Sequence, residues 1–281
     1  MHPLLAPAPT RVMGVVNVTP DSFSDGGRYL AREAAIEHGR WLAAAGADII
    51  DVGGESTRPG AQRIDPVEEC ERVLGVIEAL AADGLAVSVD TSHAHTARAA
   101  VDAGALIVND VSGSLADPAM PSVIAETGAL YVAQHLRGTP ETMNSLAQYD
   151  DVVREVSSEL AERVAALTDA GVDPGRIILD PGIGFAKVGA QNWELLAGLG
   201  ELGELGHPLL VGVSRKRFLG ELMPPERAAD PSEREAATTA LTALLAQVPV
   251  WGVRVHDAAA ARDAIAAVEE LHAATVRRDA R

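Results

Sequence analysis

Residues 11–27, RVMGVVNVTPDSFSDGG, begin as an apolar run and change at Asn17 into a polar loop that ends in a glycine pair. A short run rich in valine is typical of a strand that is buried on both faces, as the strands of parallel sheets are. Similar runs recur along the whole chain, and Ala- and Leu-rich stretches of helical length separate them. The sequence therefore predicts alternating strands and helices.

We expect strands at residues 11–18, 48–53, 86–91, 106–111, 130–135, 177–181, 208–214 and 251–256. Helices are expected near residues 31–45, 66–83, 94–103, 118–127, 151–171, 190–205, 232–247 and 258–274. This strict alternation predicts an α/β fold, a (β/α)8 TIM barrel, with a doubly wound open sheet as the alternative. Since no linker divides the chain, we expect residues 1–281 to form a single domain, with residues 1–10 as a flexible N-terminus.

The composition limits the partners of the protein. The 281 residues carry a net charge of −17, and such a field repels nucleic acid and anionic membrane surfaces. No stretch approaches the ~20 apolar residues of a membrane span, and residues 1–10 lack the features of a signal peptide. The single cysteine, Cys70, excludes a disulfide within the chain and fits a reducing compartment. We therefore expect a cytoplasmic protein without nucleic-acid or membrane partners.

The expected strands share one feature, a polar residue at the carboxyl end of the apolar run. A hydrophobic core would not hold such residues, and helix caps usually follow a strand only after a loop. In a barrel these side chains meet at the carboxyl-terminal mouth, where barrel enzymes build their active sites. The regularity favours a polar ligand held at the mouth by residues of the set Asn17, Asp51, Asp90, Asn109, Asp110, His135, Asp180, Ser214, Arg215, Lys216, Arg254 and His256.

The residue types at these strand ends indicate two halves of a ligand. Asp90, Asn109 and Asp180 offer mainly acceptors, which suits a flat heterocycle with several N–H donors along one edge. The other half of the ligand is expected to be a phosphate-like group. Its cationic donors would be Arg58, Arg254, His256 and Lys216.

A cation site and two loops complete the expected mouth. The amide oxygen of Asn17 suits a hard cation such as Mg²⁺, which takes few protein ligands and prefers phosphate oxygens and water for the rest. Residues 19–29 and 53–63 are rich in Gly, Pro and Ser, and the first of these loops carries Phe23. A passive loop gains little from Phe at a polar tip, whereas a lid that packs on a planar substrate gains much. We therefore interpret both loops as lids.

Eight segments resemble those of the dihydropteroate synthases, a family of pterin-binding enzymes. They appear in the order of the family and span residues 12–257. The family is a (β/α)8 barrel that uses Mg²⁺, is usually a homodimer and is the target of sulfonamides. The segments are MGVVNVTPDSFSDGG (13–27), DVGGESTRPGA (51–61), SVDTS (88–92), VNDVSG (108–113), HLRGTPETM (135–143), ILDPGIGFAK (178–187), LLVGVSRKRFLG (209–220) and VRVHD (253–257).

The resemblance implies a reaction in folate biosynthesis. The transferase joins 4-aminobenzoate to 6-hydroxymethyl-7,8-dihydropterin diphosphate and yields 7,8-dihydropteroate and pyrophosphate. An arylamine is neutral at pH 7, so it needs no general base, and departure of the pyrophosphate is the difficult step. We expect a dissociative step through a carbocation-like species, which Asp25 would stabilise electrostatically.

The resemblance also implies roles for individual residues. The pterin ring would be held by Asp90, Asn109, Asp180 and Lys216, and the diphosphate by Thr57, Arg58, Arg254 and His256. Asn17 would bind the Mg²⁺ ion. The 4-aminobenzoate pocket would be bordered by Phe23, Asp25, Pro59, Phe185 and Lys187. The residues expected to act in the chemical step are Asp25, Lys216 and Arg58.

One position departs from the family, and two other functions compete with this one. Gln134 stands before His135 where the family more often has Met, so an apolar wall of the pterin pocket is missing there. A methyltetrahydrofolate-type methyltransferase module shares the barrel and the pterin residues but needs neither a diphosphate cluster nor the two loops. A catalytically silent pterin-binding paralogue would keep the fold without turnover.

Overall fold

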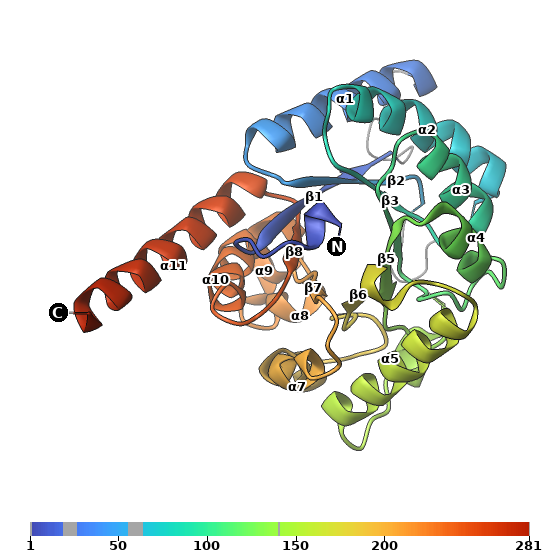
Figure 1. Cartoon of the computed structure of the whole chain (residues 1–281). Helices are drawn as coiled ribbons and strands as arrows, with labels where there is room; N and C mark the ends of the chain where they lie inside the picture. Colours follow the sequence, from blue (N-terminus) through green and yellow to red (C-terminus); the bar gives the residue numbers. More distant parts are fainter. Residues whose placement is uncertain (1, 19–26, 56–63, 140, 281) are drawn as a thin grey trace.

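The structure is a computed structural model, and it describes residues 2–18, 27–55, 64–139 and 141–280. Parallel strands form one sheet whose order is β6-β5-β4-β3-β2-β1-β8-β7. An isolated parallel bridge between Leu179 and Leu209 joins the two ends of that order and closes the sheet into a barrel (Figure 1). The strands are β1 (Arg11–Asn17), β2 (Ile49–Gly53), β3 (Val87–Asp90), β4 (Ile107–Asp110), β5 (Leu130–Gln134), β6 (Ile177–Asp180), β7 (Leu210–Val211) and β8 (Gly252–Val255).

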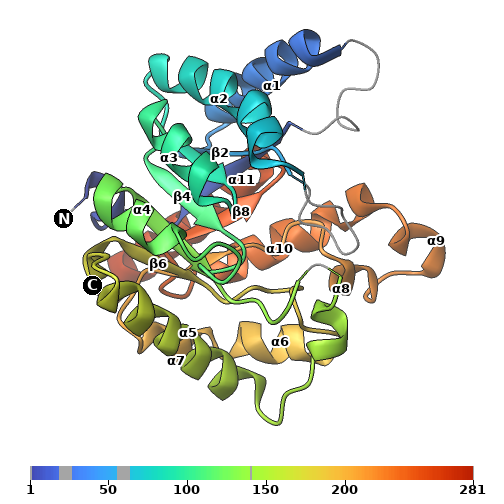
Figure 2. The ribbon, with the colours of Figure 1, turned by 90° about the vertical axis from the view of Figure 1, so that its right-hand side faces the viewer.

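Helices surround the ring of strands on its outer side (Figures 1 and 2). Three of the long ones begin at an aspartate, Asp65, Asp151 or Asp257, whose side chain accepts a backbone N–H of the first turn. The α-helices are α1 (Gly27–Ala44), α2 (Pro66–Ala82), α3 (Ala94–Asp102), α4 (Met120–Thr127), α5 (Val152–Asp169), α6 (Ala190–Ala197), α7 (Leu199–Gly203), α8 (Arg217–Gly220), α9 (Pro225–Ala228), α10 (Glu235–Leu245) and α11 (Ala258–Asp279). The predicted barrel is therefore confirmed.

Three elements differ from the expected boundaries. Residues 208–214 were expected as a strand, but only Leu210 and Val211 form the ladder of β7. The helix expected at 190–205 is divided at Gly198 into α6 and α7. Between β7 and α10 the chain adds the short helices α8 and α9 and the 3-10 helix η5 (Pro231–Arg234), which the sequence analysis did not predict.

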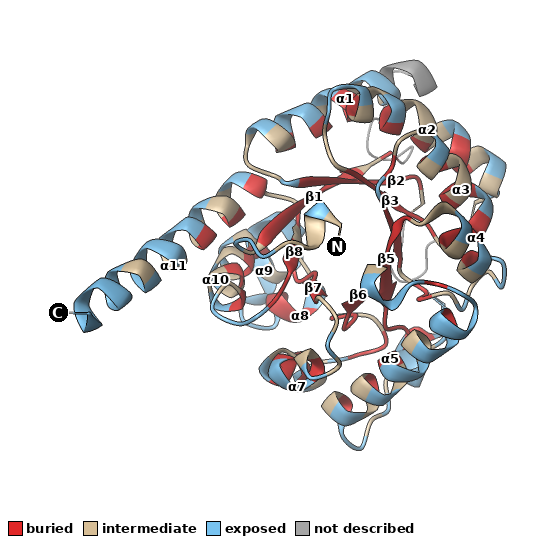
Figure 3. Cartoon of the chain, in the orientation of Figure 1, coloured by how far each residue is buried: buried red, intermediate tan, exposed pale blue. Residues whose placement is uncertain are grey.

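The hydrophobic core has two parts because alternate strand residues face opposite sides of the sheet. One part lies between the strands and the helices, and its strand residues are buried (Figure 3). The other part, here called the floor cluster, is a separate group of buried apolar residues on the same strands. The floor cluster consists of Met13, Ile49, Ile107, Leu130, Val132, Ile178, Leu210 and Trp251.

The N-terminal segment covers the floor cluster. Its 3-10 helix η1 (Pro3–Leu5) brings Leu4 and Leu5 against that cluster, and Trp251 Nε1 donates a hydrogen bond of 2.8 Å to the carbonyl oxygen of Leu4. In Figure 1 the N-terminus lies within the outline of the strand ring. We expected residues 1–10 to be flexible, and the mobility of the segment stays a prediction. In the described part of the chain, no helix combines the length and the apolar character that crossing a bilayer requires.

Candidate active site

Strand periodicity brings a second, polar layer into the barrel above the floor cluster. Inward-facing residues recur at every second position of a strand. The positions two residues beyond Ile49, Ile107 and Ile178 therefore face inward at the carboxyl-terminal mouth. They are occupied by the buried polar residues Asp51, Asn109 and Asp180.

Arg254 of β8 connects the carboxylates of this layer. Its Nε donates a hydrogen bond of 2.6 Å to Asp51 Oδ2, and its Nη2 donates one of 2.7 Å to Asp90 Oδ2. The same oxygen of Asp51 accepts a hydrogen bond of 3.0 Å from Asn109 Nδ2. The other carboxylate oxygen, Asp51 Oδ1, is buried and has no hydrogen-bond partner among the residues that the structure describes. Four strands thus contribute to one connected network at the mouth.

The network includes a residue to which the sequence analysis gave no role. Asp51 was noted only as one of the polar strand ends, and it proves to hold both Arg254 and Asn109. Arg254 was expected on the phosphate side of the ligand, but its guanidinium lies between two carboxylates. The position of Asp51 at a strand end was the available signal, whereas its partners depend on strands distant in the sequence.

Asp90 has an unusual protonation equilibrium. Burial raises the pKa of its carboxyl to about 7, and the positive charge of Arg254 opposes this rise. The neighbouring negative charge of Asp51 adds to it. Asp90 therefore changes its charge close to neutral pH. The binding of N–H donors by this carboxylate should depend on pH in the same range.

Asp180 and Lys216 form the opposite part of the mouth. Asp180 Oδ1 accepts a hydrogen bond of 2.7 Å from the backbone N–H of Gly182. Burial raises the pKa of Asp180, while Lys216 lowers it. Lys216 Nζ donates a hydrogen bond to the carbonyl oxygen of Ile183 and lies 4.5 Å from the centre of the Phe185 ring. The charge of Lys216 is therefore stabilised by a carboxylate, a carbonyl and an aromatic face.

Lys216 also lies close to the Arg254 network. A Cβ placed on Gly212 would be 4.0 Å from Lys216 Nζ and 3.7 Å from Arg254 Cβ, so the absent side chain leaves room between the two cations. Burial lowers the pKa of Lys216 to about 8, although Asp180 raises it and Arg254 adds to the lowering. The structure thus brings Asp90, Asn109, Asp180, Lys216 and Arg254 together, and their roles toward a ligand stay predictions.

Asn17 is the last residue of β1 and His256 follows the last residue of β8, so both lie at the same mouth. His256 Nδ1 lies 2.9 Å from Ser214 Oγ, and the backbone N–H of His256 donates to the same hydroxyl at 3.2 Å. Asn17 is partly exposed at the end of β1. Its side chain makes no hydrogen bond to another described residue, so its amide oxygen is available to a cation. One free amide oxygen fits a Mg²⁺ ion that takes its other ligands from phosphate and water.

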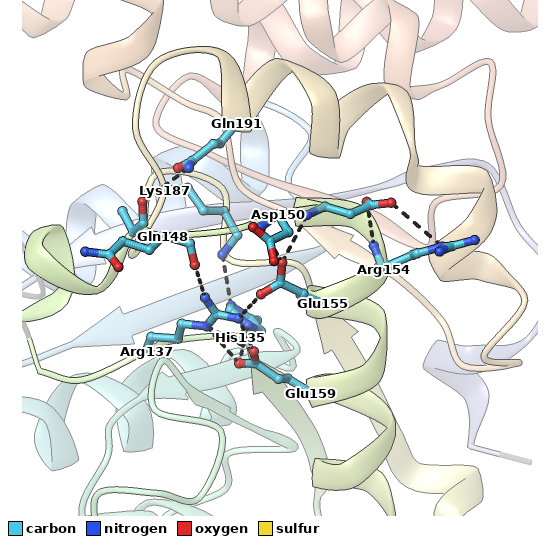
Figure 4. Close-up of polar contacts among 11 residues, drawn as sticks. His135, Arg137, Gln148, Asp150, Arg154, Glu155, Glu159, Lys187 and Gln191 are labelled. Carbon is cyan, nitrogen blue, oxygen red and sulfur yellow. Dashed lines mark hydrogen bonds and ion pairs between the residues drawn. The ribbon is translucent and has the colours of Figure 1, made fainter.

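Lys187 and His135 lie beside this mouth in a buried polar cluster (Figure 4). His135 is 1% exposed and Lys187 is 3% exposed, and Lys187 Nζ lies 2.9 Å from His135 Nδ1. His135 was expected among the polar strand ends of the mouth, and the structure places its ring inside this cluster, between Lys187 and Glu159. Lys187 was expected to border the 4-aminobenzoate pocket; its neighbours are His135 and the backbone of its own loop.

Gln134, the departure from the family, is buried at the end of β5. Its Nε2 lies 3.4 Å from the carbonyl oxygen of Val111, a long hydrogen bond that turns the amide toward the β4–α4 loop. The remaining predicted residues belong to the two loops that lie outside the described residues. They are Phe23, Asp25, Thr57, Arg58 and Pro59.

The described side chains can bind a ligand with two different ends. Buried acceptors from β3, β4 and β6 suit a ring with several N–H donors, and the cations Arg254 and Lys216 stand next to them. Ser214 Oγ meets the ring and the backbone N–H of His256 beside them. The arrangement therefore suits the binding of such a ligand and the stabilisation of charge on it.

Comparisons with known proteins agree with this geometry. The family model described as pterin binding enzyme matches residues 13–256. A dihydropteroate synthase of Mycobacterium leprae is 52% identical over 270 residues, which cover 95% of each chain.

Two solved structures of the dihydropteroate synthase of Xanthomonas albilineans are also similar. One was solved with 4-aminobenzoic acid and superposes with a TM-score of 0.87 at 46% identity. The other is a complex with 7,8-dihydropteroate and gives a TM-score of 0.84 at 44% identity. Each alignment covers 94% of both chains.

Proposed function

The chain belongs to the dihydropteroate synthases of the pterin-binding enzyme family, and from this premise we propose how its residues divide the reaction between them. The enzyme condenses 4-aminobenzoate with 6-hydroxymethyl-7,8-dihydropterin diphosphate and releases 7,8-dihydropteroate and pyrophosphate. The observation that carries the assignment of residues is the buried network of Asp51, Asp90, Asn109 and Arg254, with Asp180 and Lys216 beside it.

The pterin ring binds to the acceptors of the polar layer. Asp90, Asn109 and Asp180 accept the N–H donors along the aminopyrimidinone edge, and Lys216 donates to a ring acceptor. Charge-assisted hydrogen bonds of this kind are strong in a site shielded from water. Asp51 contacts no substrate in this proposal; it orients Asn109 and Arg254 through the bonds described above.

The diphosphate binds at the side of the mouth formed by Arg254 and His256, and Thr57 and Arg58 are the further residues proposed to bind it. When bound, a Mg²⁺ ion held by Asn17 would supply positive charge to the phosphate oxygens. Arg254 then has two tasks, since its guanidinium bonds Asp51 and Asp90 and its charge lies next to the departing group. The support is the absence of a described hydrogen bond from the Asn17 side chain and the proximity of the cations.

The chemical step is a substitution at the exocyclic carbon of the pterin. The bond from this carbon to the diphosphate oxygen breaks, and the pyrophosphate leaves with the electron pair. The electron-rich ring delocalises the positive charge, the amine nitrogen of 4-aminobenzoate forms the new C–N bond, and that nitrogen then loses a proton. Asp25 stabilises the cation, and the loops with Phe23 and Pro59 exclude water until the amine has attacked.

We further propose a cytoplasmic homodimer that binds sulfonamides where 4-aminobenzoate binds. Large exposed apolar side chains on α10 and α11 support an interface there: Leu244, Leu271 and Val276. Light scattering of the purified protein would give the dimer mass if this is correct. A monomer at micromolar concentration would contradict it.

The test of the proposed function is product formation by the purified protein. We expect pyrophosphate and 7,8-dihydropteroate to appear only when both substrates and Mg²⁺ are present. Asp25→Ala should slow pyrophosphate release without preventing pterin binding. A protein that binds the pterin but releases no pyrophosphate would be the silent paralogue, and a cobalamin requirement would indicate the methyltransferase module.

A further inference from the structure

Lys187 has no N–H group left for a substrate. An ammonium group has three donors, and those of Lys187 have three acceptors: His135 Nδ1 at 2.9 Å, the carbonyl oxygen of Phe185 at 3.0 Å and that of Gly182 at 3.2 Å. The residue is 3% exposed. Burial, and then the charge of Lys216, lower its pKa well below the ordinary lysine value. Its neighbours thus indicate a role inside the protein rather than at the ligand.

The contact with Lys187 determines the tautomer of His135. Because Nδ1 faces an ammonium donor, the ring proton is assigned to Nε2, which lies 3.0 Å from Glu159 Oε2 on α5. Burial and the charge of Lys187 lower the pKa of His135 to about 4, so the ring is neutral at neutral pH. The imidazole therefore connects the lysine to a carboxylate.

Arg137 holds Glu159 in place (Figure 4). Its Nε donates a hydrogen bond of 3.0 Å to Glu159 Oε1, and its Nη2 binds both Glu159 and Glu155, the latter at 2.8 Å. Its Nη1 donates to the carbonyl oxygen of Gln148 at 2.6 Å, and its guanidinium lies 3.9 Å from the centre of the Tyr149 ring. The hydrogen bond from His135 lowers the pKa of Glu159 to about 2 against burial, and those from Arg137 add to the lowering.

The other end of this connection is the loop between β6 and α6. Gly182, Gly184 and Ala186 of this loop have φ values of 67°, 78° and 50°, a region that only glycine adopts without strain. The same loop carries the two groups that contact Lys216, the carbonyl oxygen of Ile183 and the ring of Phe185. Lys187 is hydrogen-bonded to the loop carbonyls on both sides of Ile183.

We propose that Lys187 is a positioning residue, and that the chain of contacts Glu159–His135–Lys187, here called the relay, sets the loop that presents Phe185 and the Ile183 carbonyl to Lys216. The inference rests on the proposed function, because it takes Phe185 as a wall of the 4-aminobenzoate pocket. It reassigns Lys187 from that wall to the support behind it. The relay acts on the substrates only through Phe185 and Lys216.

The first test is steady-state kinetics of Lys187→Met, which keeps the length of the side chain and removes its donors. We expect the KM for 4-aminobenzoate to rise by about tenfold, because Phe185 would no longer be held where it forms the wall of the 4-aminobenzoate pocket. The kcat should change less than about threefold. Thermal unfolding of the variant shows whether it is folded when its kinetics are measured.

The second test uses Glu159, which is remote from the ligand. Glu159→Gln keeps an acceptor for His135 and Glu159→Ala removes it, so the KM for 4-aminobenzoate should rise more in the alanine variant. The double variant Glu159→Ala/Lys187→Met should show about the KM of Lys187→Met alone, because both changes interrupt the same relay. Asp48→Asn is the matched control. Asp48 also accepts bonds from an arginine and a backbone N–H, but it lies at the opposite end of the barrel.

The outcomes separate the relay from the reaction. If the wild type forms no product, the proposed function fails and the relay has no substrate to position. If the wild type is active but Glu159→Ala has the KM of Asp48→Asn, or if the effects of Glu159→Ala and Lys187→Met simply multiply, the relay is wrong and Lys187 acts independently of Glu159. Should Lys187→Met not fold, the comparison of the two Glu159 variants with Asp48→Asn still decides.

Discussion

At the residue scale, Asp51 and Lys187 show what a single strand-end position can and cannot predict. A polar residue at the end of an apolar run was enough to place Asp90, Asn109 and Asp180 at the mouth, since the carboxyl ends of barrel strands meet there. The role of Asp51 could not be predicted, because its partners come from β4 and β8. The same is true of Lys187, whose partner His135 is 52 residues away in the sequence.

The pH dependence of pterin binding should follow two residues of the mouth. Asp90, with a pKa of about 7, is a carboxylate above that pH, and Lys216, with a pKa of about 8, is charged below that pH. We expect a hydroxymethyl-dihydropterin without phosphate to bind most tightly between about pH 7 and 8. Titration calorimetry from pH 5.5 to 9 measures this.

Two single substitutions show which residue causes the weaker binding on each side of the pH optimum. Asp90→Asn should remove the weakening toward acid pH, because an amide does not titrate, and Lys216→Met should remove the weakening toward alkaline pH. This ligand carries no phosphate, so the ionisation of a phosphate group does not contribute to the pH profile. An acidic limb that persists in Asp90→Asn would exclude Asp90 as its source.

Removal of Asp51 should cost both stability and activity. Asp51→Ala leaves the Arg254 guanidinium with one carboxylate instead of two, and breaking a buried pair costs about 3 kcal/mol in free energy of unfolding. The kcat/KM should fall about 10²-fold as Arg254 and Asn109 lose their orientation. Denaturant unfolding and steady-state rates are the measurements. Ser88→Ala is the control, since that buried hydroxyl bonds to none of the described residues, and the change should leave stability and activity nearly unchanged.

At the element scale, the long helices and the strands with ladders on both sides were predicted well. Strand β7 was predicted too long, because its apolar run continues past the two residues that pair with β8. The run contains Gly212, which leaves space for Arg254 and Lys216 rather than continuing the ladder. The short helices α8 and α9 could not be predicted, since four-residue helices carry too little periodicity.

The loop between β6 and α6 should be intolerant of any side chain at Gly182. Its φ is 67°, and an added Cβ would collide with the carbonyl oxygen of His135. We expect Gly182→Ala to lower the free energy of unfolding by about 2 kcal/mol and to raise the KM for 4-aminobenzoate. Gly200→Ala in α7, where a Cβ meets nothing within 4 Å, should instead leave stability unchanged or slightly higher. Equal effects of the two changes would contradict the prediction.

At the scale of the whole molecule, the two ends of the barrel have separate tasks. The mouth collects the polar network, and the other end is closed by the floor cluster and the N-terminal segment. Such a division was predictable from the fold, since barrels place activity at the carboxyl ends of the strands and stability at the opposite face. The covering of the floor by residues 3–5 was not predicted, because the segment has no periodicity of its own.

Deletion of residues 2–6 should therefore affect stability and leave substrate binding intact. It exposes part of the floor cluster, removes the hydrogen bond from Trp251 to Leu4 and removes that from Arg11 to the Ala6 carbonyl. We expect a loss of about 2 kcal/mol in free energy of unfolding from the two leucines. The KM values of both substrates should equal those of the full chain. A changed KM would show that the two ends are coupled.

The barrel closes through an isolated bridge between Leu179 and Leu209, and this affects where the sheet can open transiently. This bridge between β6 and β7 is here called the seam. Asp180 comes after β6 on one side of it and Lys216 comes after β7 on the other, so a transient opening of the seam would widen the proposed pterin site while the other strand pairs stay intact. Amide protons along the seam should then exchange with deuterium sooner than those of β2 and β3. Bound pterin would contact both sides of the seam and slow that exchange. The seam would then be the hinge that opens for substrate binding and product release.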